Sequence, residues 1–256
     1  MMIFFTDLDN TIIYSYKHDI GLRKRNVEIY QGREISFITE DTYAYLKRLR
    51  EQILVIPTST RTVEQYERID LGVGVFKYAL VCNGGVLLEN GKKVDWWYNE
   101  SIKEIRDSKD TVLKGIRILD KDPRRTFELR YIENLFVFTK CDSPEDVVDE
   151  LKGKLDEKFV DIFHNGTKVY IVPKALNKGR AVKRFMDYIG AKFSIAAGDS
   201  EFDISMLKAV DIGLVPFAFT SQFCIDFKLE EMESNKIFSD ALLLRCLEII
   251  SKAEQR

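Results

Sequence analysis

Residues 2–11 read MIFFTDLDNT, an apolar run that leads through Thr6 into two carboxylates, Asp7 and Asp9, with one residue between them. Continuous apolar runs of this kind are typical of strands that are buried on both faces of a parallel sheet. Two like charges at the end of such a strand repel each other unless a nearby cation neutralises them. The stretch therefore predicts a buried parallel strand whose carboxyl end holds a cation.

The composition is that of an ordinary globular chain. At 256 residues the chain is long enough for one large domain or two modest ones. Hydrophobic residues make up 45% and charged residues 31%, which separates the chain from disordered and membrane proteins. The 39 basic and 41 acidic residues leave a net charge of -2, so no global field favours nucleic acid or anionic lipid. We therefore expect no nucleic-acid or membrane partner.

The four cysteines are widely spaced and form no CxxC pair, which indicates neither a zinc site nor a dense disulfide framework. We expect reduced and mostly buried thiols at Cys82, Cys141, Cys224 and Cys246. The N-terminus lacks the features of a signal peptide, and no run approaches the roughly 18 apolar residues of a membrane span. The expected location is therefore the cytoplasm.

The hydrophobic pattern divides the chain into a core and an insertion. Residues 1–85 and 172–256 alternate short apolar runs with amphipathic helices, which favours a doubly wound α/β core around a parallel sheet. The expected strands are MIFF, ILVIP, YALVC and FSIAAGD, and the expected helices are EDTYAYLKRLRE, TVEQYERI, NKGRAVKRFMDYIG, FDISMLKAV and DALLLRCLEII.

Residues 86–171 have a different pattern, which predicts a smaller inserted α+β domain. LLENGKKV and IFHNGTKVYIV each place Asn-Gly between strand-like flanks, and this dipeptide predicts a type I′ hairpin turn. FELRYI and LFVFTKC predict a further pair of strands. SPEDVVDELKGKL predicts a helix with Ser143 at its N-cap and Pro144 at its first position.

Polar residues follow each expected strand of the core, and in open α/β sheets ligands bind outside the carboxyl ends of the strands. Clustered carboxylates with no His or Cys nearby suit Mg²⁺, and a lysine with several hydroxyls suits the oxygens of a phosphoryl group. The pattern favours phosphoryl transfer. The residues expected at this edge are Asp7, Asp9, Thr11, Thr58, Ser59, Thr60, Arg61, Asn83, Gly84, Gly85, Lys178, Asp199, Ser200 and Asp203.

DLDNT, PTSTR, the lysine of NKGRAV and GDSEFD resemble, in that order, the four motifs of the haloacid dehalogenase superfamily of phosphatases. The insertion after CNGG resembles a cap of the C2B type. This resemblance implies a Rossmann-like catalytic core with a cap domain. It also implies magnesium-dependent hydrolysis of a small phosphorylated metabolite, such as a sugar phosphate.

The resemblance also implies a role for each motif residue. Asp7 would attack phosphorus and form an aspartyl-phosphate, and Asp9 would transfer the protons. Ser59 and Lys178 would bind the phosphoryl group. Magnesium would be held by Asp7, by the main-chain carbonyl of Asp9 and by Asp199, with Asp203 supporting them directly or through water. The residues expected to bind the substrate are Thr11, Arg61, Asn83 and Gly84.

Two departures from the family's pattern leave alternatives open. Phe202 stands where the fourth motif usually has asparagine, and any of Thr58, Ser59 and Thr60 offers a hydroxyl for the phosphoryl group; we choose Ser59 because Ser-Thr-Arg falls where relatives have Thr-Gly-Arg. The same fold also supports a phosphomutase, which passes the phosphoryl group to a sugar hydroxyl. A third possibility is a module that senses a phosphometabolite without turning it over.

Overall fold

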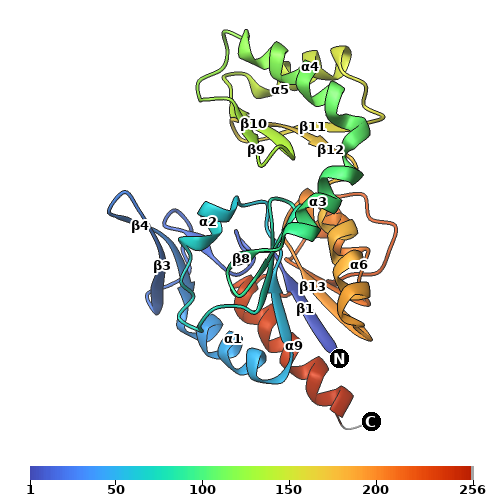
Figure 1. The fold of residues 1–256 in the computed structure, drawn as a ribbon. Helices are drawn as coiled ribbons and strands as arrows, with labels where there is room; N and C mark the ends of the chain where they lie inside the picture. Colours follow the sequence, from blue (N-terminus) through green and yellow to red (C-terminus); the bar gives the residue numbers. More distant parts are fainter. Residues whose placement is uncertain (255–256) are drawn as a thin grey trace. The chain divides into compact units, whose positions relative to one another are not determined.

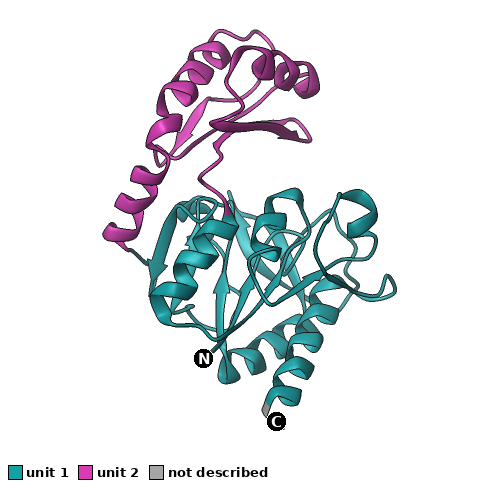
Figure 2. Ribbon diagram, turned by 90° about the vertical axis from the view of Figure 1, so that its right-hand side faces the viewer, with its two compact units in different colours: residues 1–93, 178–256 teal, residues 94–177 magenta. Residues whose placement is uncertain are grey.

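The computed structural model describes residues 1–254. The chain forms two compact units, residues 1–93 with 178–256 (unit 1) and residues 94–177 (unit 2), as Figure 2 shows. The junctions lie later in the chain than the expected boundaries at residues 85/86 and 171/172. The first shift has a plain cause, because strand β7 (Val86–Glu89) pairs with β6 (Tyr78–Val81) and stays with unit 1.

Unit 1 is built on a parallel sheet with the order β15-β14-β13-β1-β5. The strand β1 carries the apolar run of MIFFT and lies between β13 and β5, and it pairs in parallel with both. The bounds are β1 (Met2–Thr6), β5 (Leu54–Pro57), β13 (Phe193–Ala197), β14 (Ile212–Val215) and β15 (Glu230–Glu231).

Helices cover both faces of this sheet. Successive side chains of a strand point to opposite faces, so a strand that is apolar throughout needs packing partners on both. Phe4 packs in one cluster with Leu46 and Leu242, whereas the ring of Phe5 meets that of Phe185 at a centroid distance of 6.0 Å. These contacts place α1 and α9 on one face and α6 on the other (Figure 1). The doubly wound fold is confirmed. The bounds are α1 (Glu40–Gln52), α2 (Val63–Glu67), α6 (Lys178–Ile189), η2 (Glu201–Asp203), α7 (Ile204–Leu207), α8 (Phe219–Gln222) and α9 (Phe238–Glu254).

Two antiparallel sheets complete unit 1. The first, with the order β2-β4-β3, was not expected from the sequence; its strands are β2 (Tyr14–Ser15), β3 (Lys24–Tyr30) and β4 (Arg33–Thr39). The second joins β6, β7 and β8 (Lys92–Lys93). Asn90 and Gly91 form its turn with φ values of 50° and 76°, as a type I′ turn requires. This turn was predicted correctly.

Unit 2 packs helices on a four-stranded antiparallel sheet with the order β11-β12-β10-β9. The second Asn-Gly turn was predicted one residue too early. Asn165 pairs with Lys168, so Gly166 and Thr167 form the turn and Gly166 takes the positive φ of 54°. The helices α3 and α4 were not expected. The bounds are α3 (Asp95–Glu104), η1 (Arg106–Ser108), α4 (Lys109–Asp120), β9 (Arg130–Ile132), β10 (Phe136–Lys140), α5 (Pro144–Lys154), β11 (Val160–Asn165) and β12 (Lys168–Pro173).

Candidate active site

A buried lysine joins two carboxylates at the carboxyl end of the parallel sheet. Nζ of Lys178, at the start of α6, lies 2.5 Å from Oδ1 of Asp7 and 2.6 Å from Oδ1 of Asp203. The side chains of all three residues are at least nine-tenths buried. Charge-assisted hydrogen bonds of this length in a buried site are strong, so the three groups form one rigid unit.

Asp199 completes a cluster of carboxylates around this lysine. Oxygen atoms of Asp7, Asp199 and Asp203 lie within 4.8 Å of one another, and the hydroxyl of Thr11 donates to Oδ1 of Asp199 at 3.2 Å. Within the described residues this cluster consists of hard oxygen donors, which are the ligands that Mg²⁺ prefers. The Asp9 side chain is not part of this cluster.

The GDSEFD stretch folds so that Asp203 returns to its own start. Oδ2 of Asp203 accepts from the main-chain nitrogens of Asp199 and Ser200 at 3.1 and 3.0 Å, and from the hydroxyl of Ser200 at 2.9 Å. A Cβ atom at Gly198 would lie 2.3 Å from Cβ of Asp203. Glycine is therefore required at position 198 because the returning side chain fills the space.

The cluster holds more negative charge than one ammonium balances. Burial raises the pKa of Asp7 well above its usual value, although the charge of Lys178 acts in the opposite direction. Burial and the nearby charge of Asp203 raise the pKa of Asp199 to about 7. Burial alone would lower the pKa of Lys178, but the two carboxylates outweigh it and raise that pKa. The donor set fits a divalent cation, which would take the place of the bound protons.

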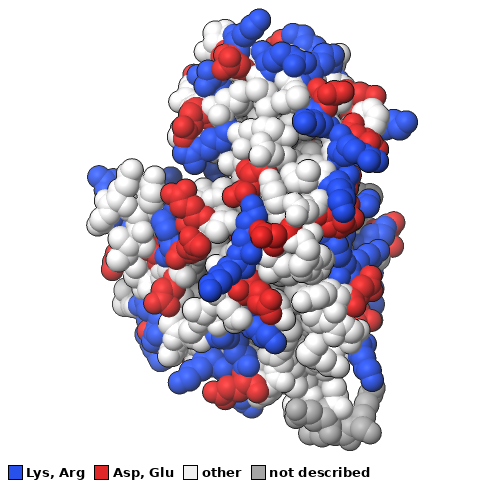
Figure 3. Space-filling model, viewed as in Figure 1, with Lys and Arg blue, Asp and Glu red and all other residues white. Residues whose placement is uncertain are grey.

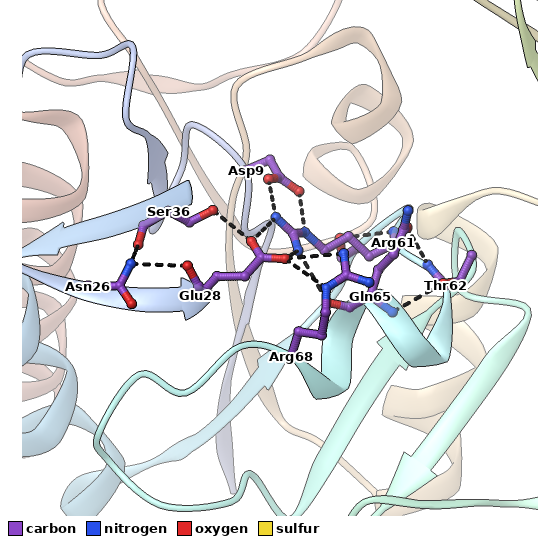
Figure 4. Close-up of polar contacts among 9 residues, drawn as sticks. Asp9, Asn26, Glu28, Ser36, Arg61, Thr62, Gln65 and Arg68 are labelled. Atoms are coloured by element: carbon purple, nitrogen blue, oxygen red, sulfur yellow. Dashed lines mark hydrogen bonds and ion pairs between the residues drawn. The ribbon is translucent and has the colours of Figure 1, made fainter. Parts of the chain in front are cut away.

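Asp9 lies apart from the cluster and is paired with Arg61. Nε and Nη2 of Arg61 each donate to one carboxylate oxygen of Asp9, both at 2.8 Å (Figure 4). The Asp9 side chain is 51% exposed, so this carboxylate can meet a ligand from solvent. The structure thus brings a predicted proton-transfer residue and a predicted substrate residue into one bidentate pair.

The hydroxyls after β5 have different partners. Thr58 donates its hydroxyl proton to the main-chain oxygen of Ile56 at 3.2 Å, whereas the Ser59 oxygen accepts from the main-chain nitrogen of Arg61 at 3.2 Å. The main-chain nitrogen of Asn83 donates to the Ser59 carbonyl at 3.0 Å, which brings CNGG beside PTSTR. Asn83 and Gly84 are buried and both have positive φ values, 58° and 86°.

One residue of this region was missed from the sequence. Glu28 on β3 is buried, and its carboxylate accepts hydrogen bonds from Arg61 on the side away from Asp9 (Figure 4). The only signal in the sequence is an acidic residue between Val27 and Ile29, which reads as the polar face of a strand. Its burial comes from strand pairing that the local pattern does not encode.

The mixed charge of the surface and the burial of most thiols agree with what the composition and the spacing of the cysteines predict. Lys and Arg side chains are interspersed with Asp and Glu on the face shown in Figure 3. Cys82, Cys141 and Cys246 are buried and Cys224 is exposed, and none of the four is in a disulfide in the described residues. Among the helices within residues 1–254, none combines the length and apolar content needed to cross a membrane.

Comparison with known proteins finds similarity to the superfamily that the four motifs resemble. A sequence model of the haloacid dehalogenase-like hydrolase family matches residues 92–215, which include Lys178, Asp199 and Asp203. The alpha,alpha-trehalose-phosphate synthase [UDP-forming] B of Dictyostelium discoideum is 22% identical over 258 aligned residues, 97% of this chain. The chain spans 30% of the length of that curated relative.

Solved structures with the same fold cover nearly the whole chain. A sucrose-phosphatase of Synechocystis sp. PCC6803, solved with sucrose and phosphate, has a TM-score of 0.62 at 12% identity, over 98% of both chains. A Thermotoga maritima protein has a TM-score of 0.60 at 20% identity, over 95% of this chain and 96% of that one. A subclass IIB sugar phosphatase of the superfamily has a TM-score of 0.57 at 12% identity, over 97% and 99%. The fold that the resemblance implies, a core with an inserted domain, is confirmed.

Proposed function

We propose, from the premise that the chain has the haloacid dehalogenase fold, that it is a magnesium-dependent phosphomonoester hydrolase acting on a small phosphorylated metabolite, such as a sugar phosphate. The observation that carries the proposal is the position of Lys178 between Asp7 and Asp203, with Asp199 alongside. A nucleophilic carboxylate, a fixed cation and a cluster of metal ligands then lie at one strand end. This combination suits attack on an anionic phosphoryl group.

The reaction would take two steps. In the first, a carboxylate oxygen of Asp7 bonds to phosphorus, the ester bond breaks, and Asp9 gives its proton to the leaving oxygen. In the second, Asp9 takes a proton from water, whose oxygen bonds to phosphorus and releases Asp7 and phosphate. Lys178 would offset charge on the phosphoryl oxygens throughout. Ser59 would donate to one of them, and the bond from Thr58 to the Ile56 carbonyl supports the choice of Ser59.

The cation would be held by Asp7 and Asp199 and by the main-chain carbonyl of Asp9, with Asp203 in support. When bound, Mg²⁺ supplies positive charge that neutralises the carboxylates and polarises the phosphoryl group. Thr11 keeps Asp199 oriented through its hydroxyl. Asn83 and Gly84 would face the substrate, and unit 2 would act as a cap that excludes water and contributes contacts to the substrate.

The test is phosphate release from a panel of sugar phosphates and 4-nitrophenyl phosphate, with Mg²⁺ and with chelator, using Asp7→Asn as the blank. Release that requires Mg²⁺ and disappears in the blank supports the hydrolase. Isomerisation of a sugar phosphate without net release would favour a mutase. Binding of panel members without any turnover would favour a sensing module.

A further inference from the structure

Glu28 is buried in a strand whose pattern would place it in solvent. Regular alternation along β3 would turn Val27 and Ile29 inward and Glu28 outward. Instead Glu28 is 1% exposed and Ile29 is 58% exposed. The pairing of β3 with β4 shifts register on both sides of Glu28, between Asn26 and Ile29. Such a bulge re-aims a side chain, and here it turns a carboxylate into the protein.

Burial of a carboxylate lowers the stability of the folded protein by several kcal/mol unless the charge is paired and hydrogen-bonded. Oε1 of Glu28 accepts from Nη1 of Arg61 at 2.8 Å and from Nη2 of Arg68 at 3.3 Å. Oε2 accepts from the hydroxyl of Ser36 at 2.6 Å and from Nη2 of Arg61 at 3.0 Å. Burial alone would raise the pKa of Glu28, but hydrogen bonds from Arg61 and Ser36 outweigh it and hold that pKa below its usual value. Glu28 is thus a fixed anion.

Arg61 connects this fixed anion to Asp9. Its guanidinium lies between the two carboxylates, and Nη2 donates to both of them (Figure 4). Because the guanidinium is planar and its donors form a rigid fork, the angle at which Glu28 holds it decides the angle at which it meets Asp9. Glu28 forms the buried end of this chain and Asp9, at 51% exposure, the accessible end.

We propose that Glu28 is a positioning residue that, through Arg61, keeps the Asp9 carboxylate at the place from which it transfers protons. This inference rests on the proposed function. Misplacement of a reacting group by 1 Å can lower a reaction rate by about 10²-fold. Loss of the Glu28 carboxylate, which holds Arg61 from the side opposite Asp9, should therefore lower the rate measurably.

A purely structural role would make a different prediction. Glu28 also ties the hairpin of β3 and β4 to the end of α2 through Arg68, whose guanidinium stacks over the ring of Tyr30 at 4.7 Å. Among the described residues, Arg61 is the one that bonds both Glu28 and Asp9. Arg68→Gln is therefore a matched control, since it removes a charged partner of Glu28 and leaves the path to Asp9 in place.

The test compares kcat/KM on two probes of similar shape. The phenolate of phenyl phosphate leaves poorly without a proton, whereas that of 4-nitrophenyl phosphate leaves well, so the first probe depends more on the general acid. We expect Glu28→Gln to lower kcat/KM about 10-fold on phenyl phosphate and less than about 2-fold on 4-nitrophenyl phosphate. Arg68→Gln should leave the ratio of the two values unchanged. An equal loss on both probes in Glu28→Gln, or the same change of ratio in Arg68→Gln, would overturn the inference.

A second measurement does not depend on turnover. The Nε–H group of Arg61, assigned in NMR spectra by its loss in Arg61→Lys, should exchange with solvent about 10-fold faster in Glu28→Gln and unchanged in Arg68→Gln. A wild-type protein that releases no phosphate from either probe or from any sugar phosphate of the panel would sink the proposed function. An active wild type whose ratio and exchange rate are both unchanged by Glu28→Gln would sink the positioning role alone.

A second variant, Glu28→Asp, keeps the inference testable if Glu28→Gln does not fold. Glu28→Asp keeps the charge but is one methylene too short to hold both nitrogens of Arg61, so an intermediate ratio of the two kcat/KM values is expected. Circular dichroism and thermal unfolding confirm that each variant is folded before its rates are compared. A wild-type ratio in folded Glu28→Asp would count against the inference.

Discussion

Nζ of Lys178 lies 2.5 Å from Oδ1 of Asp7, although the two residues are 171 positions apart in the chain. The ammonium also bonds Asp203, so one charge ties the end of β1 and the helix η2 to the start of α6. A Cβ atom at Gly179 would lie 2.1 Å from the carbonyl oxygen of Ser205. This close approach of α6 to α7 sets the lysine in place.

Removal of this ammonium should destabilise the fold. Lys178→Met leaves two buried carboxylates without their counter-ion, a change that typically costs about 3–5 kcal/mol. Urea unfolding measures the loss, and Lys183→Met on the exposed side of the same helix is the control, expected to stay within about 0.5 kcal/mol of wild type. Equal stability of the two variants would mean that Lys178 is not the counter-ion of the cluster.

Asp7→Asn should abolish turnover while the protein stays folded. An amide has almost the shape of the carboxylate but cannot serve as the nucleophile, so phosphate release should fall by at least about 10³-fold. Mass spectrometry of the acid-quenched wild type during turnover should find a phosphoryl group on the peptide that contains Asp7. Turnover near the wild-type rate in Asp7→Asn would rule out the proposed nucleophile.

Stability without metal should fall as the pH rises from 5 to 7.5. The folded-state pKa of Asp199 is about 7, above the value of about 3.9 for an unfolded chain. Between these values the folded state keeps a proton that the unfolded state has lost, so the free energy of unfolding decreases with rising pH and levels off above about 7. Calorimetry in the presence of chelator measures this slope.

Mg²⁺ should counteract that loss because it binds the deprotonated carboxylates. Its stabilising effect is therefore expected to be larger at pH 7.5 than at pH 5. Asp199→Asn, which removes the titrating group, should have a shallower pH slope in chelator. The prediction fails if wild type and Asp199→Asn have the same slope.

Gly198→Ala should damage both stability and activity. The added methyl group would lie 2.3 Å from Cβ of Asp203, so the loop after β13 must move at a cost of at least about 2 kcal/mol. Gly153→Ala is the control, since a Cβ at this position of α5 meets nothing within 4 Å. That variant should be more stable than wild type by about 0.5–1 kcal/mol. Equal effects of the two substitutions on thermal unfolding would contradict the role given to Gly198.

Local pattern predicted the elements that are buried on both sides or have strong end signals. The apolar runs of β1, β5 and β13 and the helices α1 and α6 could be read from the chain because their hydrophobic period matches their burial. The antiparallel strands β3 and β4 were not predicted, because their exposed residues and the bulge at Glu28 interrupt the alternation of apolar and polar residues. The helices α3 and α4 were missed as well.

The sequence by itself determined the doubly wound sheet and the convergence of Asp7, Asp199 and Asp203, because residues that follow parallel strands meet at one edge whatever the loops between them do. Lys178 joins them from the start of α6, a helix that leads back to this sheet. The tertiary structure decided which side chain the Asp9 carboxylate faces. Asp9 meets Arg61, and Arg61 meets a carboxylate that a strand bulge turns inward. The physical reason is that the pairing of buried charges depends on contacts between segments far apart in the chain, which no local period records.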